Sequence, residues 1–127
     1  MILNLPPSVR LFVSTEAVDL RKSFDGLSAL VEHALAQDPL SGHLFVFFNR
    51  AADRVKILWF DHGGYALFYK RLERGRFRVP EAKPGERSVA MRAGELALIL
   101  EGIDLAGARR RPRWEPAPRK MHATLNP

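Results

Sequence analysis

The chain of 127 residues contains no cysteine, which excludes disulfide bonds within it and thiolate metal sites. Its four histidines, His33, His43, His62 and His122, lie far apart in the sequence and lack the spacing of metal ligands. We therefore expect neither a bound metal nor a cofactor.

Long hydrophobic runs are also missing. The longest, Leu44 to Phe48 and Leu96 to Leu100, have five residues each, whereas a helix that crosses a bilayer needs ~20. The N-terminal residues show no charged leader followed by an apolar stretch, so a secretory signal is not expected. These absences predict a soluble, cytoplasmic protein without a membrane partner.

Acidic residues are scarce in two places. Residues 50–78 hold eight Lys or Arg and three Asp or Glu, and residues 109–127 hold six Lys or Arg and only Glu115. The net charge of the whole chain is +6. A basic surface of this kind attracts polyanions, and nucleic acid is the first candidate.

Five segments have the pattern of β-strands. Residues 8–14 alternate between apolar and other side chains, and residues 44–49 read as a strand buried on both faces. Three further strands are expected at 55–60, 65–72 and 76–79, with turns at His62–Gly64 and Glu73–Gly75 between them. The order predicts an antiparallel meander, closed by Pro80.

Two helices are expected. The first has apolar residues at helical spacing from Asp19, a suitable N-cap, to about Gln37, and the second covers Ala93–Glu101 with Gly102 as the C-cap glycine. We therefore predict one α+β domain at 1–105, an antiparallel sheet of about five strands packed by two helices. The proline-rich basic residues 106–127 are expected to form a flexible tail.

The register of the predicted hairpins decides where the cations point. If His62–Gly64 and Glu73–Gly75 are three-residue loops, Lys56 faces Lys70, and Lys70 faces Arg78. Like charges in such a row destabilise a sheet, and a phosphate backbone would relieve the repulsion. A two-residue turn would shift the side chains to the other face and break the row.

Further cations extend the predicted nucleic-acid surface. Arg71, Arg74 and Arg76 lie in the same hairpin region, while Arg21 and Lys22 fall in the first turn of the first predicted helix. Cations are unfavourable at the positive end of a helix, so either a phosphate contact or pairing with Asp19 and Asp25 can explain them. The tail adds contacts from charge alone: Arg109, Arg110, Arg111 and Arg113.

Aromatic residues on the hairpin support a second interpretation. Most of them should pack in the core, but Trp59, Tyr65 and Tyr69 can anchor a protein interface. The domain would then be an adaptor for a protein partner instead of a DNA-binding module.

Motifs of enzymes are absent from the sequence: there is no nucleophile elbow and no phosphate-binding glycine loop. Glu81 and Lys83 have a spacing used by some metal-dependent nucleases, but they lie in a proline-bounded loop. An acidic cluster of Asp19, Asp25, Asp61 and Glu73 is not required by their spacing. We expect no catalytic residues, with a metal-dependent nuclease as the least favoured alternative.

Five blocks of sequence occur in a recognisable order: DLRKSFDGLSALV at 19–31, SGHLFVFFNR at 41–50, VKILWFD at 55–61, YKRLERGRFRVP at 69–80 and LEGIDL at 100–105. Together they resemble the small accessory protein TnpB, the second open reading frame product of the IS-sixty-six family of bacterial insertion sequences. The resemblance covers about residues 8–105.

The resemblance implies a role in transposition beside a separate transposase, which carries the chemistry, and beside another accessory protein of the same element. Two motifs of the family match this chain. One matches Asp19, Arg21, Lys22, Asp25 and Gly26, and the other matches residues 69–77. The match departs at 86–94, where no Ser or Thr cap precedes the second helix. No catalytic residue carries over.

The sequence thus predicts a transposition accessory protein of the bacterial cytoplasm that binds DNA without catalysis, at the element ends or without sequence preference. The expected contacts are to phosphates, so affinity should fall steeply with salt.

Overall fold

A computed structural model describes residues 5–101, 103–104 and 109–110. Its elements in chain order are β1 (Leu11–Ser14), α1 (Phe24–His33), β2 (Leu44–Phe48), β3 (Arg54–Asp61), β4 (Gly64–Arg71), β5 (Ser88–Met91), α2 (Ala93–Glu101), β6 (Ile103–Asp104) and β7 (Arg109–Arg110). The prediction of an α+β fold with five strands and two helices in the main domain is confirmed.

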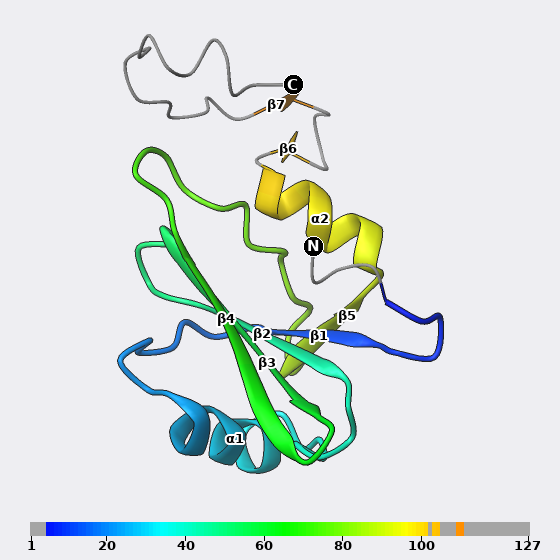
Figure 1. Cartoon of the computed structure of the whole chain (residues 1–127). Helices are drawn as coiled ribbons and strands as arrows, with labels where there is room; N and C mark the ends of the chain where they lie inside the picture. The colour runs from blue at the N-terminus through cyan, green and yellow to red at the C-terminus, as the bar shows by residue number, and fades with distance from the viewer. Residues whose placement is uncertain (1–4, 102, 105–108, 111–127) are drawn as a thin grey trace, which may run out of the picture.

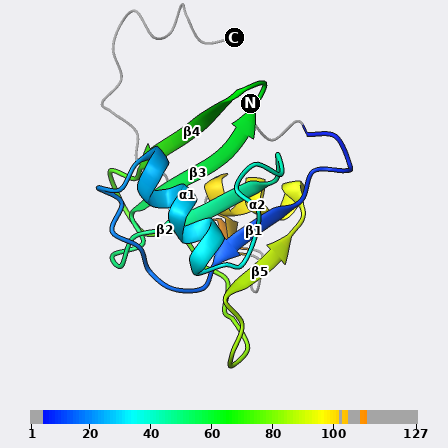
Figure 2. The same ribbon diagram turned by 90° about the horizontal axis from the view of Figure 1, so that it is seen from below.

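The five-stranded sheet has the order β4-β3-β2-β1-β5. Neighbouring strands are antiparallel except for β1 and β2, which pair in parallel because α1 carries the chain back between them. Figure 1 shows α1 under one face of the sheet and α2 over the other, and Figure 2 shows α1 in front of the sheet from below. The domain therefore has three layers.

Two hydrophobic cores lie on the opposite faces of the sheet. The α1 core includes Leu27 and Val31 of the helix with Phe45, Phe47 and Leu58 of the strands. The α2 core is formed by Leu11, Val13, Leu44, Val46, Phe48, Val55, Ile57, Phe77, Leu96, Ile99 and Leu100. Every residue of β2 is buried, as expected for a central strand that is covered on both faces.

The first helix is shorter than predicted. Its first intrahelical bond runs from Leu27 N–H to the Ser23 carbonyl, so Asp19 does not cap it. Asp19 instead forms a separate turn, since its carbonyl accepts the Lys22 N–H at 3.1 Å. The helix ends at His33 instead of Gln37, and Ala36 beyond it has the left-handed φ of 54°.

The predicted strand at 76–79 is absent, and the fifth strand of the sheet is β5, which lies at the edge opposite β4. Phe77 leaves the sheet plane because its ring packs on Phe48 at 5.6 Å between centroids and its N–H bonds to the Ala52 carbonyl at 2.7 Å. The chain then crosses to the opposite edge, where β5 pairs antiparallel with β1. The meander prediction is therefore confirmed only for β2, β3 and β4.

The β3–β4 turn has two residues, not three. Asp61 pairs with Gly64, and the turn residues His62 and Gly63 have φ values of 45° and 88°. Positive φ at both positions is the geometry of a type I′ turn, whose twist matches that of a hairpin. The predicted three-residue loop is therefore wrong.

The helix α2 follows the predicted range of Ala93–Glu101. The predicted C-cap Gly102 lies outside the described residues, and so do residues 105–108 and 111–127 of the predicted domain end and tail. Within the tail the described part is β7, which pairs with β6. In the described part of the chain, neither helix is long and apolar enough to span a membrane.

Candidate nucleic-acid interface

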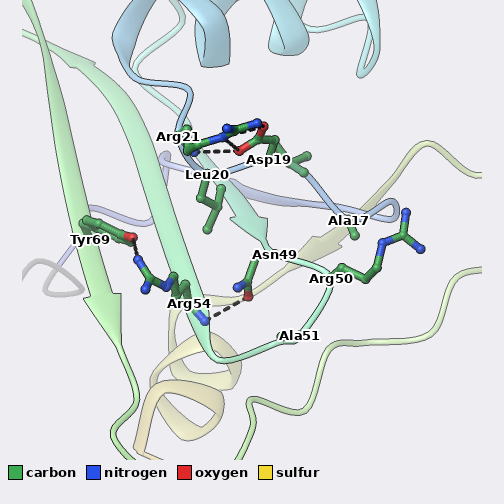
Figure 3. A pocket seen from close by; sticks show the side chains of 10 residues that line it. Ala17, Asp19, Leu20, Arg21, Asn49, Arg50, Ala51, Arg54 and Tyr69 are labelled. Atoms are coloured by element: carbon green, nitrogen blue, oxygen red, sulfur yellow. Dashed lines mark hydrogen bonds and ion pairs between the residues drawn. The ribbon is translucent and has the colours of Figure 1, made fainter.

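A groove opens beside the end of β2, between the segment that precedes α1 and the β2–β3 turn. We call it the arginine groove, and its volume is about 600 Å³. Figure 3 shows the side chains that line it. They are Ala17, Val18, Asp19, Leu20, Arg21, Asn49, Arg50, Ala51, Arg54 and Tyr69. Three arginines thus line one hollow together with apolar residues.

The β2–β3 turn is fixed by the Asn49 side chain. Its Oδ1 accepts the backbone N–H groups of Asp53 and Arg54 at 3.1 and 3.0 Å, and its Nδ2 donates to Asp53 Oδ1 at 2.7 Å. An Asn side chain that bonds the following backbone replaces ladder bonds in such a turn. The following segment adds support, because Leu72 N–H donates to the Asp53 carbonyl at 2.7 Å. Arg50 and Arg54 are therefore presented by a rigid turn.

Tyr69 contacts two cations, Arg54 of the groove lining and the buried Lys56. Its hydroxyl accepts a hydrogen bond from Arg54 Nη1 at 2.7 Å, and the Lys56 Nζ lies 4.7 Å from the ring centroid. Lys56 is only 6% exposed, and its ammonium also donates to the Lys22 carbonyl at 2.8 Å. A buried ammonium that bonds a carbonyl and faces a ring ties β3, β4 and the segment before α1 together.

Asp19 and Arg21 form an exposed ion pair at the rim of the groove. The Asp19 carboxylate accepts hydrogen bonds from the Arg21 backbone N–H at 3.0 Å and from its Nη2 at 2.6 Å. These bonds lower the pKa of Asp19 from 3.8 to about 2 and raise the pKa of Arg21 above its ordinary value. Arg21 thus follows the pairing interpretation in this structure, and it precedes α1 instead of occupying its first turn.

The predicted row of Lys56, Lys70 and Arg78 does not form. In the observed register Lys56 faces Tyr69, and Lys70 faces Val55, so the two lysines point to opposite faces of the sheet. Lys70 donates to the Leu100 carbonyl of α2 at 3.3 Å. Arg78 lies outside any strand. The register prediction is wrong because the turn has one residue fewer than assumed.

A different pair of like charges takes the place of that row. Arg54 and Arg71 are direct partners across β3 and β4. Their guanidinium groups have separate partners, since Arg54 bonds the Tyr69 hydroxyl and Arg71 forms an ion pair with Glu73 at 2.7 Å. The ion pair raises the pKa of Arg71. The basic charge at this end of the hairpin thus comes from Arg71, which was among the predicted contacts, and from Arg54, which was not.

The remaining predicted contacts lie on the surface or outside the described residues. Arg74, Arg76 and Arg78 are exposed in the segment after β4, and Lys22 is exposed before α1. Arg109 and Arg110 are described only as the backbone of β7, and Arg111 and Arg113 lie outside the described residues.

Sequence reasoning missed Asn49, Arg50 and Arg54, because it assigned no role to the connection between the strands expected at 44–49 and 55–60. A signal was present: two arginines flank a tight turn that starts with Asn, a residue that organises turns through its side chain. Among the aromatic candidates, Trp59 and Tyr65 pack against the two cores, whereas Tyr69 is 46% exposed. Among the described residues, no three His, Asp or Glu side chains are grouped closely enough to bind a metal ion.

Comparisons with known proteins place the chain in a family. A relative from Sinorhizobium fredii (strain NBRC 101917 / NGR234), the uncharacterized protein y4hO, is 40% identical over 97 residues, which cover 76% of this chain and 83% of the relative. The uncharacterized protein y4jC of the same strain is 37% identical over 108 residues, which cover 85% of this chain and 91% of the relative. No solved structure matches the chain.

The family described as IS66 Orf2 like protein matches residues 9–110, which include both motifs of the predicted resemblance and every described residue of the arginine groove. This family has an accessory role in the transposition of insertion sequences and implies association with a transposase. It is not a known catalytic family. The chain belongs to the IS66 Orf2-like family of insertion-sequence accessory proteins.

Proposed function

We propose that this protein binds DNA without catalysis within a transposase complex, and that the arginine groove is its main phosphate contact. The observation that carries the proposal is the meeting of Arg21, Arg50 and Arg54 in one groove of about 600 Å³. Guanidinium groups are suited to this role because they bind phosphate oxygens with two parallel N–H donors.

Rigid placement supports the proposal. Arg54 is held through its backbone N–H by Asn49 and through its guanidinium by Tyr69. A side chain that is already ordered loses less conformational entropy when a phosphate binds. The groove therefore offers a prepared contact, and the exposed Arg74, Arg76 and Arg78 after β4 would add electrostatic attraction for the same polyanion.

The ion pair of Asp19 and Arg21 is compatible with phosphate binding. Arg21 is 91% exposed in its side chain, and exposed ion pairs contribute little to stability in water. A DNA phosphate can thus share or replace the carboxylate as a partner of the guanidinium. Lys56 has a different part in the proposal: its buried ammonium positions Tyr69 and the Lys22 segment, and it does not contact DNA.

The proposal is tested by the salt dependence of DNA binding. Fluorescence anisotropy with a labelled duplex at several salt concentrations gives the slope of log affinity against log salt, to which each phosphate contact contributes ~0.9. We expect Arg50→Ala and Arg21→Ala each to lower the affinity and to reduce the slope by about one contact.

The matched control is Arg87→Ala. This exposed arginine precedes β5, at the edge of the sheet opposite β4, and its removal changes the net charge by the same amount. A loss that is equal in Arg87→Ala and Arg50→Ala would mean that the chain binds DNA by its overall charge, and the groove would lose its role. The absence of DNA binding by the wild-type protein would refute the proposed function as a whole.

A further inference from the structure

Tyr69 combines exposure with an unusually fixed position. It is 46% exposed and lines the arginine groove, while Arg54 holds its hydroxyl at 2.7 Å and the Lys56 ammonium lies 4.7 Å from the ring centroid. Most other aromatic side chains of the hairpin contribute to the two cores or to each other. An aromatic ring that is both ordered and accessible is a surface on which a planar group can stack.

The groove also has the composition that a nucleotide needs. Its lining combines the apolar residues Ala17, Leu20 and Ala51 with the charged Arg21 and Arg50. Apolar contacts suit the base, and the guanidinium groups suit the phosphate on either side of it. A volume of about 600 Å³ falls in the ~300–1,000 Å³ range of sites for small molecules.

A DNA duplex cannot use the whole of this groove. Its bases are stacked inside the helix, so it offers phosphates to the arginines but no free base to Tyr69. A single strand offers both at once. We propose that the arginine groove holds an unpaired nucleotide of single-stranded DNA, with its base stacked on Tyr69 and its phosphates bound by Arg21, Arg50 and Arg54. This inference rests on the proposed function, because it assigns the form of DNA that the same groove binds.

The test measures anisotropy with a labelled single strand of about 20 nucleotides, the duplex of the same sequence, and a single strand with abasic sites. The wild-type protein should bind the normal single strand about tenfold more tightly than the duplex at equal salt. Abasic sites should weaken binding by about five- to 100-fold, because the phosphates remain and the stacking base is lost.

The protein variants separate the ring from the charge. Tyr69→Leu should lose about five- to 100-fold in affinity for the single strand and little for the duplex, with the salt slope unchanged. Tyr69→Phe keeps the ring and should retain most of the preference. Tyr65→Leu is the matched control, because Tyr65 lies on the same face of β4 but outside the groove. The abasic strand needs no variant and remains decisive if Tyr69→Leu does not fold.

Two results would refute different claims. If normal and abasic single strands bind equally while binding remains sensitive to salt and to Arg50→Ala, the stacking inference is wrong and the proposed DNA-binding function stands. If no nucleic acid is bound, the proposed function fails and the inference fails with it. A single-stranded RNA of the same sequence tests whether the bound nucleotide belongs to DNA or RNA. If the RNA binds more than tenfold more tightly than the single-stranded DNA, the assignment to DNA is wrong.

Discussion

Replacing Lys56 by methionine tests whether a buried ammonium fixes the groove. The side chain is 6% exposed, donates to the Lys22 carbonyl at 2.8 Å and lies 4.7 Å from the centroid of the Tyr69 ring. Lys56→Met keeps a chain of similar length, so the packing of the stem is largely preserved. The change removes the charge, the hydrogen bond and the cation–π contact.

The expected change in the free energy of unfolding is the sum of stabilising and destabilising contributions. A hydrogen bond from a charged donor stabilises by ~1.5–3 kcal/mol, and a desolvated cation–π contact adds up to ~2 kcal/mol. Burying the ammonium costs several kcal/mol of desolvation free energy, and this cost is absent in the variant. The Lys22 carbonyl, however, is left without its donor. We expect Lys56→Met to lower the free energy of unfolding by about 2 kcal/mol, which corresponds to a fall of about 10 °C in Tm for a domain of this size.

Urea unfolding followed by circular dichroism measures the change directly. Lys22→Met is the matched control, because the carbonyl of Lys22 accepts the bond and its exposed side chain does not take part. The control should change the free energy of unfolding by less than ~0.5 kcal/mol. If Lys56→Met is as stable as the wild type or more stable, the ammonium does not hold these segments together and the reasoning is wrong.

Three further predictions concern the turns and the groove rim. Asn49→Ala removes three hydrogen bonds from the β2–β3 turn and should lower the free energy of unfolding by about 1–3 kcal/mol in urea titrations, and an unchanged midpoint would show that water replaces the side chain. His62→Asn should raise stability by about 0.5–1 kcal/mol, because Asn tolerates the φ of 45° in a type I′ turn better than His, and a lower urea midpoint would contradict this. The Asp19 carboxyl should titrate near its pKa of about 2 in NMR spectra, so its stabilising effect is complete above the ordinary value of 3.8 and is lost as the pH falls through about 2. Arg21→Gln should return this pKa toward 3.8, and a midpoint that does not move would disprove the assigned cause.

The parts of the fold that depend on local patterns were predictable. The apolar run of β2 and the helical spacing of α2 depend on neighbours in the sequence, and both elements occur where they were expected. The start of α1 was not predictable in this way, because the Asp19 side chain can either cap a helix or pair with a nearby cation. It was assigned to cap the helix, but it bonds Arg21, and the Lys22 carbonyl after it accepts a bond from Lys56 on a distant strand.

The wrong register of Lys56 and Lys70 has one source, the length of the β3–β4 turn. Sequence alone does not distinguish a loop of His62–Gly64 from a turn of His62 and Gly63, yet one residue decides whether Lys56 faces Lys70 or Tyr69. The absence of a strand at 76–79 has a different reason. Phe77 fits the pattern of a strand, but its ring is 3% exposed in the α2 core, and such long-range packing overrides a short local pattern.

The pairing of β1 with both β2 and β5 has a consequence for synthesis of the protein. β1 is made first, but Leu11 has Leu44 as its partner on one side and Met91 on the other. Closing such a long loop is slow compared with forming the β3–β4 hairpin, so the hairpin can fold early. One edge of β1 stays unpaired until residue 91 has left the ribosome. A chain stalled before β5 would expose that edge to other nascent chains, so premature termination should yield aggregates instead of a smaller functional domain.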